Sequence, residues 1–214
     1  MTRTQSRRQA YGKKADYKKE PRQLYLPSSK TVGLIDVPPL QFIIIDGHGD
    51  PNTSKEFREA VEVLFSVSYA VKFIVKKGDA GVDYGVMPLE SLWWSDDMTT
   101  FSVKNKSDWN WTLMIMQPER VTPGLFAIAL QQVRKKKNLT ALSKLRLHTF
   151  TEGKSAQILY VGPFSEEGPT IAKIHSSIEQ QGYRVAGKHH EIYLSDIRKT
   201  APDKLKTIPR QPMQ

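Results

Sequence analysis

Hydrophobic residues of this chain gather in short runs that end at glycine or proline. One such run, Leu40 to Asp46, is rich in β-branched isoleucine and stops before Gly47, which is typical of a buried central strand. Comparable patterns predict further strands at residues 31–37, 83–94, 109–117, 157–161, 183–194 and 204–209, with a bend near Gly187 in the stretch 183–194.

Three longer stretches carry hydrophobic residues at helical spacing. Ser54 can cap the first helix, and Gly78 follows its basic last turn. Its predicted buried face consists of Phe57, Val61, Leu64, Val71 and Val75, and Tyr69 lies on the flank of that face. A second helix begins after Thr122 with Pro123 and ends in a basic run at 134–137, and a third extends from about 166 to 181.

The predicted elements follow the order strand, helix, strand, strand twice along the chain. The repeat predicts an α+β fold with one unit at about residues 31–118 and another at about 122–210. Two such units with antiparallel sheets leave a groove between them, and grooves between similar units are common sites for small ligands. Residues 1–23 are polar and without periodicity, which favours a flexible arm.

Composition limits the function classes that need to be considered. The chain has 214 residues, of which 39% are hydrophobic, so it can bury a sizeable core. No apolar run approaches the roughly 20 residues that span a bilayer, and the N-terminus lacks an apolar signal segment, so a cytoplasmic protein without membrane partners is expected. Cysteine is absent, which excludes disulfides and thiolate chemistry.

The net charge of +10 is concentrated at one end of the chain. Residues 1–30 contain nine Lys or Arg and only two acidic residues, and the remaining 184 residues carry a net charge of only +3. Because solvated basic arms are common, this distribution disfavours nucleic acid as a partner.

A carboxylate and a phenol stand two residues apart in the predicted strand at 183–194. Successive side chains of a strand alternate faces, so Glu191 and Tyr193 emerge on one side while Ile192 and Leu194 emerge on the other. A buried carboxylate is costly without a partner, so the Glu191 face is either solvated or a site. In an aromatic cleft, burial is expected to raise the pKa of Glu191 and make it a better base near neutral pH.

Four tryptophans lie within nineteen residues. Each of them on its own is better explained as part of the core, because large aromatic rings dominate core burial. Trp93 and Trp94, however, are adjacent in a predicted strand and must point to opposite faces, so one of them leaves the helix-covered side and can form the wall of a pocket. Trp109 and Trp111 share one face of the following strand.

Other chemistry has little support in the sequence. His189 and His190 face opposite ways, and the remaining histidines lack ligand spacing, so neither a metal site nor a cofactor is expected. The stretch Gly47 to Gly49 is too short for a phosphate-binding loop, and no Gly-x-Ser-x-Gly motif of a serine hydrolase occurs. Glu90 is a second acid near the tryptophans but is equally well explained as a turn residue.

Several segments together resemble the GyrI-like small-molecule-binding family, and more narrowly its stand-alone branch that includes cyclopropanoid cyclopropyl hydrolases. These segments are Leu26-Pro27, Phe42 to Pro51, Pro88 to Trp94, Trp111 to Pro118, Gly162 to Phe164 and His189 to Asp196. The resemblance as a whole extends from about residue 13 to the end. The resemblance implies two β-α-β-β modules of the SHS2 type with pseudo-twofold symmetry, in a single domain over 24–214. It also implies a central cleft with a buried glutamate, which Glu191 matches.

The resemblance implies a hydrolase that opens the strained cyclopropane of DNA-alkylating compounds by adding water, a detoxification reaction. Glu191 would activate the water, and a phenol, Tyr193 or Tyr69, would hydrogen-bond to water or substrate. The expected ligand is a hydrophobic polycyclic small molecule, held between aromatic side chains: Trp93, Trp94, Trp111 and Phe164.

Two alternatives remain at this level. A multidrug-binding, sequestering or effector-sensing protein of the same family would need the same cleft without turnover. A sensor attached to DNA is disfavoured because the 30-residue N-terminal segment is too short and polar for a helix-turn-helix. A gyrase-type protein partner would instead use a surface patch independent of Glu191.

Overall fold

The computed structural model describes residues 22–78, 81–96 and 106–214, so the predicted arm lies outside the described residues up to residue 21. The helical elements are α1 (Arg22–Tyr25), α2 (Lys55–Lys77), η1 (Lys106–Asp108), α3 (Pro123–Lys136), η2 (Thr140–Lys144), η3 (Phe164–Glu166), α4 (Gly168–Gln180) and η4 (Pro202–Lys204). The strands are β1 (Gly33–Val37), β2 (Leu40–His48), β3 (Leu89–Trp94), β4 (Asn110–Met116), β5 (Arg146–Phe150), β6 (Gly153–Gln157), β7 (Tyr160–Val161), β8 (His189–Tyr193) and β9 (Lys206–Pro212).

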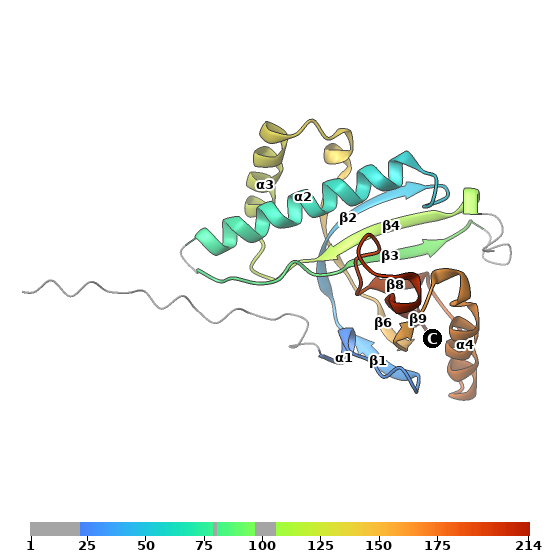
Figure 1. Ribbon diagram of the computed structural model, residues 1–214. Coiled ribbons are helices and arrows are strands. Elements are labelled where there is room, and N and C mark those ends of the chain that lie inside the picture. Colours follow the sequence, from blue (N-terminus) through green and yellow to red (C-terminus); the bar gives the residue numbers. More distant parts are fainter. Residues whose placement is uncertain (1–21, 79–80, 97–105) are drawn as a thin grey trace, which may run out of the picture.

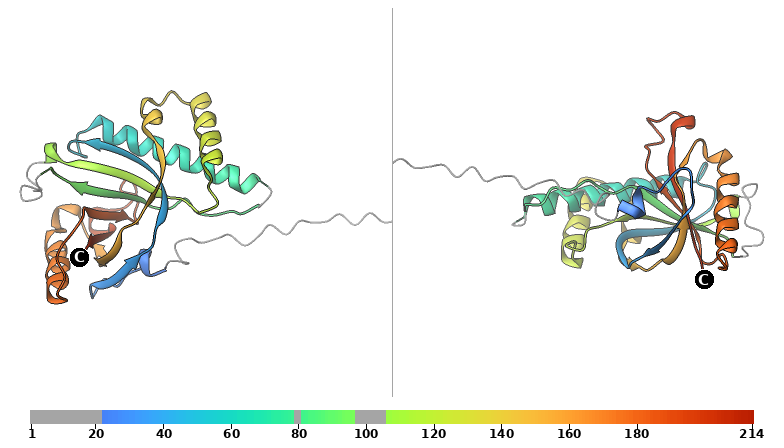
Figure 2. Two further views of the ribbon diagram at one scale, coloured as in Figure 1. Left: turned by 180° about the vertical axis from the view of Figure 1, so that it is seen from behind. Right: turned by 90° about the horizontal axis from the view of Figure 1, so that it is seen from below.

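The described strands form one antiparallel sheet that curls into a half-barrel (Figures 1 and 2). Its order is β1-β6-β9-β8-β3-β4-β2-β5, and β7 pairs with β9. Helix α2 lies across β2 and β4, and α4 packs on β6 and β9 (Figure 1). The predicted α+β class is therefore confirmed.

The predicted order strand, helix, strand, strand is present in both halves. One set consists of β2, α2, β3 and β4, and its strands lie in the order β3-β4-β2. The other set consists of β6, α4, β8 and β9, and its strands lie in the order β8-β9-β6. The two sets share one sheet because β3 pairs with β8. A twofold relation between their coordinates stays a prediction. Helix α3, which follows the predicted boundary at residue 122, packs against α2.

Helix α2 forms where capping and periodicity predict it. Ser54 accepts a hydrogen bond from the backbone N–H of Phe57 at 3.1 Å, and the N–H of Gly78 closes the last turn on Ile74. The buried side chains are Ala60, Val63, Leu64, Val67, Ser68, Val71 and Val75. One face of this helix thus covers the sheet, and Phe57 and Val61 lie at its margin.

The strand pattern departs from the prediction at polar segments. β5 is not predicted, because it is an edge strand with mostly exposed residues. The strand predicted at 157–161 is displaced: β6 ends at Gln157 after the polar sequence GKSAQ, and β7 covers only Tyr160–Val161. β3 begins only at Leu89, directly after Pro88, which has no N–H for the ladder. β8 begins only at His189, after Gly187 with φ of 61°.

Candidate functional site

Glu191 and Tyr193 lie on the helix-covered face of the sheet. In the register of β3 and β8, Ser91 lies opposite Glu191, and Trp93 lies opposite His189. The ring of Phe57, in the first turn of α2, stacks on Trp93 at 5.9 Å, so this face looks toward the helices. The predicted alternation is confirmed, since Ile192 is fully buried on the other face. We call Ser91, Trp93, His189, Glu191 and Tyr193 the Glu191 cluster.

The phenol of Tyr193 connects this cluster. Its hydroxyl donates to Glu191 Oε2 at 2.5 Å, and its oxygen accepts from Trp93 Nε1 at 3.2 Å and lies 2.7 Å from Ser91 Oγ. A phenol has one hydrogen, which Glu191 receives, so the Ser91 hydroxyl donates to Tyr193. Burial and the charge of Glu191 raise the pKa of Tyr193 well above its ordinary value. Tyr193 is therefore a neutral donor that orients the carboxylate.

Glu191 is ionised despite its burial. Its side chain is 16% exposed, and its Oε1 lies 3.4 Å from His189 Nε2. Burial acts to raise the pKa of Glu191, but the neighbouring His189, the hydrogen bond from Tyr193 and the nearby Trp93 N–H outweigh burial and lower it. The expected rise of this pKa is thus wrong, because the expectation considered burial without the donors that the fold supplies.

A second carboxyl group, which the sequence analysis missed, is coupled to Glu191. Glu167 precedes α4 as its N-cap residue, but its side chain makes no capping hydrogen bond and is only 2% exposed. Its Oε1 has no hydrogen-bond partner. Burial and the charge of Glu191 raise the pKa of Glu167 to about 9. One carboxyl is thus ionised and the other protonated at neutral pH, which is the arrangement of an acid and base pair.

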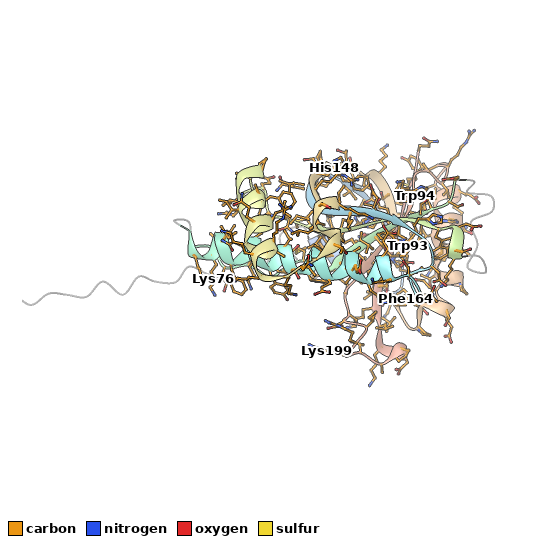
Figure 3. All side chains as sticks on the ribbon, turned by 90° about the horizontal axis from the view of Figure 1, so that it is seen from above. Lys76, Trp93, Trp94, His148, Phe164 and Lys199 are labelled. Carbon is orange, nitrogen blue, oxygen red and sulfur yellow. The ribbon has the colours of Figure 1, made fainter. Side chains whose placement is uncertain are left out.

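Of the predicted aromatic residues, Trp93 belongs to the Glu191 cluster and Phe164 contacts it. Trp93 is buried between Phe57 and Trp109, whose ring meets it edge-on at 5.3 Å. Phe164, in η3, is 40% exposed and meets Tyr193 edge-on at 5.7 Å. In the view of Figure 3, Phe164 lies toward one side, Trp94 and His148 toward the other, and Trp93 between them. Phe164 is thus an accessible apolar ring beside the carboxylate.

The other predicted ligand-binding residues lie elsewhere. Trp111 is fully buried and meets the ring of Phe57 edge-on, with ring centroids 5.3 Å apart. Tyr69 is 48% exposed and lies 12 residues after Phe57, which is about 18 Å along α2. Trp94 emerges on the opposite face of the sheet, as its neighbour Trp93 requires.

The opposite face carries a buried ionic network. His190 bridges Glu90 Oε2 at 3.0 Å and Glu152 Oε1 at 2.8 Å, and Arg210 Nη1 donates to Glu152 Oε2 at 2.9 Å. Tyr25 donates to Glu90 Oε1 at 2.7 Å. Glu90 is therefore a buried strand residue of this network, not a turn residue. The two adjacent histidines face opposite ways, as predicted.

Within residues 22–78, 81–96 and 106–214, no group of three or more His, Cys, Asp or Glu side chains is arranged to hold a metal ion. None of the described helices combines the length and apolarity needed to cross a membrane.

Comparison with known proteins gives a consistent family assignment. Two proteins of Listeria innocua are similar in structure: an uncharacterized conserved protein with 41% identity and a TM-score of 0.87, and a hydrolase encoded by lin2189 with 40% identity and a TM-score of 0.85. A structure described as a hydrolase from Listeria innocua has 39% identity and a TM-score of 0.82. Each alignment covers 94% of this chain and all of the other.

No curated protein sequence matches the chain. The family model for the GyrI-like small-molecule-binding domain, however, matches residues 30–208, which is most of the chain. The curled antiparallel sheet and its two flanking helices agree with that match. The chain therefore belongs to the GyrI-like small-molecule-binding domain family.

Proposed function

We propose that this protein is a hydrolase that opens the strained cyclopropane of DNA-alkylating cyclopropanoid compounds by adding water, and so detoxifies them. The observation that carries the proposal is the Glu191 carboxylate, which stays ionised within an aromatic cluster and has Tyr193 to orient it. Because it is unprotonated at neutral pH, this carboxylate can orient a water molecule and accept its proton, although its lowered pKa makes it a weaker base than a carboxylate with a raised pKa. The hydrolase descriptions of relatives with about 40% identity over their full length also support it.

In the proposed reaction, Glu191 takes a proton from water as the water oxygen forms a bond to a cyclopropane carbon. The strained carbon–carbon bond breaks, and its electron pair moves into the conjugated ring system, which becomes an aromatic phenol after its carbonyl oxygen gains a proton. Glu167 is the proposed proton donor, because its carboxyl group is protonated at neutral pH. The proton on Glu191 then restores Glu167 through solvent, so the enzyme ends unchanged.

The aromatic side chains have separate parts in this proposal. Phe164 offers an exposed ring beside Tyr193, and Trp93 forms an apolar wall whose orientation Phe57 and Trp109 hold. A flat polycyclic ligand that stacks against such rings would place the strained carbon next to the Glu191 carboxylate. Trp111 supports this wall from the core. Tyr69 remains a candidate contact for a long ligand.

The decisive experiment incubates an activated cyclopropane with catalytic amounts of protein and measures the ring-opened product, one water heavier, by mass spectrometry. Glu191→Gln is expected to lower kcat about 10²- to 10⁴-fold, the usual contribution of a general base. Glu179→Gln, on the exposed side of α4, is the matched control and should leave the rate unchanged. Unaltered turnover by Glu191→Gln would rule out the general-base role.

The same assay separates an enzyme from a binding protein. Formation of several product molecules per protein supports hydrolysis, whereas tight binding with no product beyond the buffer rate supports a sequestering or sensing protein of the same family. In that second case the Glu191 carboxylate would serve to attract the ligand, and Glu191→Gln would weaken binding without any effect on the reaction rate.

A further inference from the structure

A cavity of about 450 Å³ lies on the face of the sheet opposite the Glu191 cluster. Its floor consists of side chains from neighbouring strands: Ile44 of β2, Leu92 of β3 and Met114 of β4, all buried. Met114 lies opposite Ile44 in the sheet, so these side chains form one continuous apolar surface. Trp94 extends that surface to the rim. The volume is suited to a small organic molecule.

Most charged groups at this cavity are already paired. Arg146 Nη2 lies 2.6 Å from Asp46 Oδ2, and Thr112 donates to the other Asp46 oxygen at 2.7 Å. Both oxygens of Glu152 are occupied by His190 and Arg210. The carboxylates that line the cavity are therefore neutralised by their own partners.

Lys188 is the exception at the rim. Its Nζ lies 3.1 Å from the centroid of the Trp94 ring, a cation–π contact that holds the ammonium group at the edge of the apolar floor. Among the described residues, none of the carboxylates is within ion-pair distance of it. Burial lowers the pKa of Lys188, which means that its charge is poorly solvated in the absence of an anion. The charge of Asp46 opposes this effect, but Asp46 is ion-paired to Arg146, so the cavity presents one ammonium group that has no ion-pair partner of its own beside an apolar surface.

We propose that this cavity is a second binding site, separate from the Glu191 cluster, for a small amphipathic organic anion. The aromatic or aliphatic body of the ligand lies on Leu92, Met114 and Trp94, and its carboxylate or sulfonate binds Lys188. The sheet separates the two sites, so Glu191 does not contribute to this one, and its negative charge favours the opposite kind of ligand.

The test compares two probes that differ only in charge. The protein is titrated with 8-anilinonaphthalene-1-sulfonate and with the neutral N-phenyl-1-naphthylamine, and fluorescence gives each Kd. Lys188→Met is expected to raise the Kd of the sulfonate about tenfold, because a charge-assisted contact is lost, and to leave that of the neutral probe within about twofold. Lys188→Arg should retain sulfonate binding, and Trp94→Phe should weaken both probes.

Two variants serve as matched controls. Lys154 also lies over an aromatic ring, that of Tyr183 at 5.3 Å, but does not line the cavity, so Lys154→Met should bind both probes like the wild type. Glu191→Gln should also bind both probes with the Kd of the wild type. The proposal is overturned if Lys188→Met and Lys188→Gln both bind the sulfonate like the wild type. It is equally overturned if Glu191→Gln weakens sulfonate binding as much as Lys188→Met does.

Discussion

At the scale of single residues, Glu191 and Glu167 show how hydrogen-bond donors decide the charge of a buried carboxyl group. Glu191 receives donors from Tyr193 and the surrounding cluster, and its pKa falls below the ordinary value. Glu167 has an unpartnered Oε1, so burial and the charge of Glu191 raise its pKa to about 9. Two acids of the same type thereby take opposite roles in the proposed reaction.

The raised pKa of Glu167 predicts that the stability of the protein depends on pH. A carboxyl group whose pKa is raised by folding binds more protons in the folded state than in the unfolded state between about pH 4.5 and 9. The free energy of unfolding therefore falls as the pH rises through this range, by at most about 1.4 kcal/mol per pH unit. Glu167→Gln removes this loss. Its Tm relative to the wild type should therefore increase from pH 5 to pH 8 in thermal unfolding scans.

The neighbouring residue provides the control for this experiment. Glu166 is exposed in η3, so Glu166→Gln should shift Tm by a similar small amount at every pH. A difference between Glu167→Gln and the wild type that does not vary with pH would contradict the raised pKa.

The sequence alone predicts only some of the residues of this site. The spacing of Glu191 and Tyr193 is sufficient to place both on one face, because alternation in a strand is a local property. It cannot indicate Glu167, because this residue lies 24 positions away and reaches the site only through the packing of α4. An acid directly before Gly168 and Pro169 indicates a helix start, but helix starts are usually solvated.

At the scale of elements, the pairing of β2 with β4 depends on one glycine. Gly47 lies directly opposite Trp111, and a Cβ at Gly47 would overlap the indole ring. The ring thus covers the backbone of its partner strand, and Phe57 of α2 packs against the ring in turn. This contact connects the first turn of α2 to the sheet at the place where Trp93 borders the candidate site.

Gly47→Ala is expected to lower the free energy of unfolding by about 1–3 kcal/mol, because the well-packed indole must move. Chemical denaturation with a fluorescence readout measures the change. Gly124→Ala, in the first turn of α3, meets no atom closer than 3.8 Å and should be neutral or stabilising by up to about 1 kcal/mol. Equal stability of Gly47→Ala and the wild type would show that the ring has room.

Whole elements are predictable where their hydrophobic pattern is strong. The caps and the buried face of α2 and the isoleucine run of β2 have clear local signals, and both elements form where expected. β5 lacks such a signal because it is an edge strand with mostly exposed residues: it is held by its hydrogen bonds to β2 and by only two partly buried side chains, Leu147 and Phe150.

At the scale of the whole molecule, the sheet separates two environments. The Glu191 cluster lies on the helix side, and the other side holds the cavity beside Trp94 and the network of Glu90, Glu152, His190 and Arg210. Through Tyr25 and the carbonyl of Leu24, this network also connects the short helix α1 to strands at the centre of the sheet.

Tyr25→Phe tests the importance of that connection. Its phenol donates to Glu90, which is fully buried, so its removal leaves a buried carboxyl group with one donor fewer. The free energy of unfolding should decrease by about 1–3 kcal/mol in denaturant titrations. Tyr69→Phe, at an exposed position on α2, should change it by no more than about 0.5 kcal/mol. A Tyr25→Phe variant as stable as Tyr69→Phe would contradict the structural role of the hydrogen bond.

The sequence by itself determined the main helices, the central strands and the shared face of Glu191 and Tyr193, because periodicity and capping depend on residues close together in the chain. Only the tertiary structure decided that Glu191 is ionised, that Glu167 accompanies it, and which neighbours Trp93 and Trp94 have on their opposite faces. Ion pairs, hydrogen bonds and pKa values depend on distances between segments far apart in the chain, and packing sets those distances.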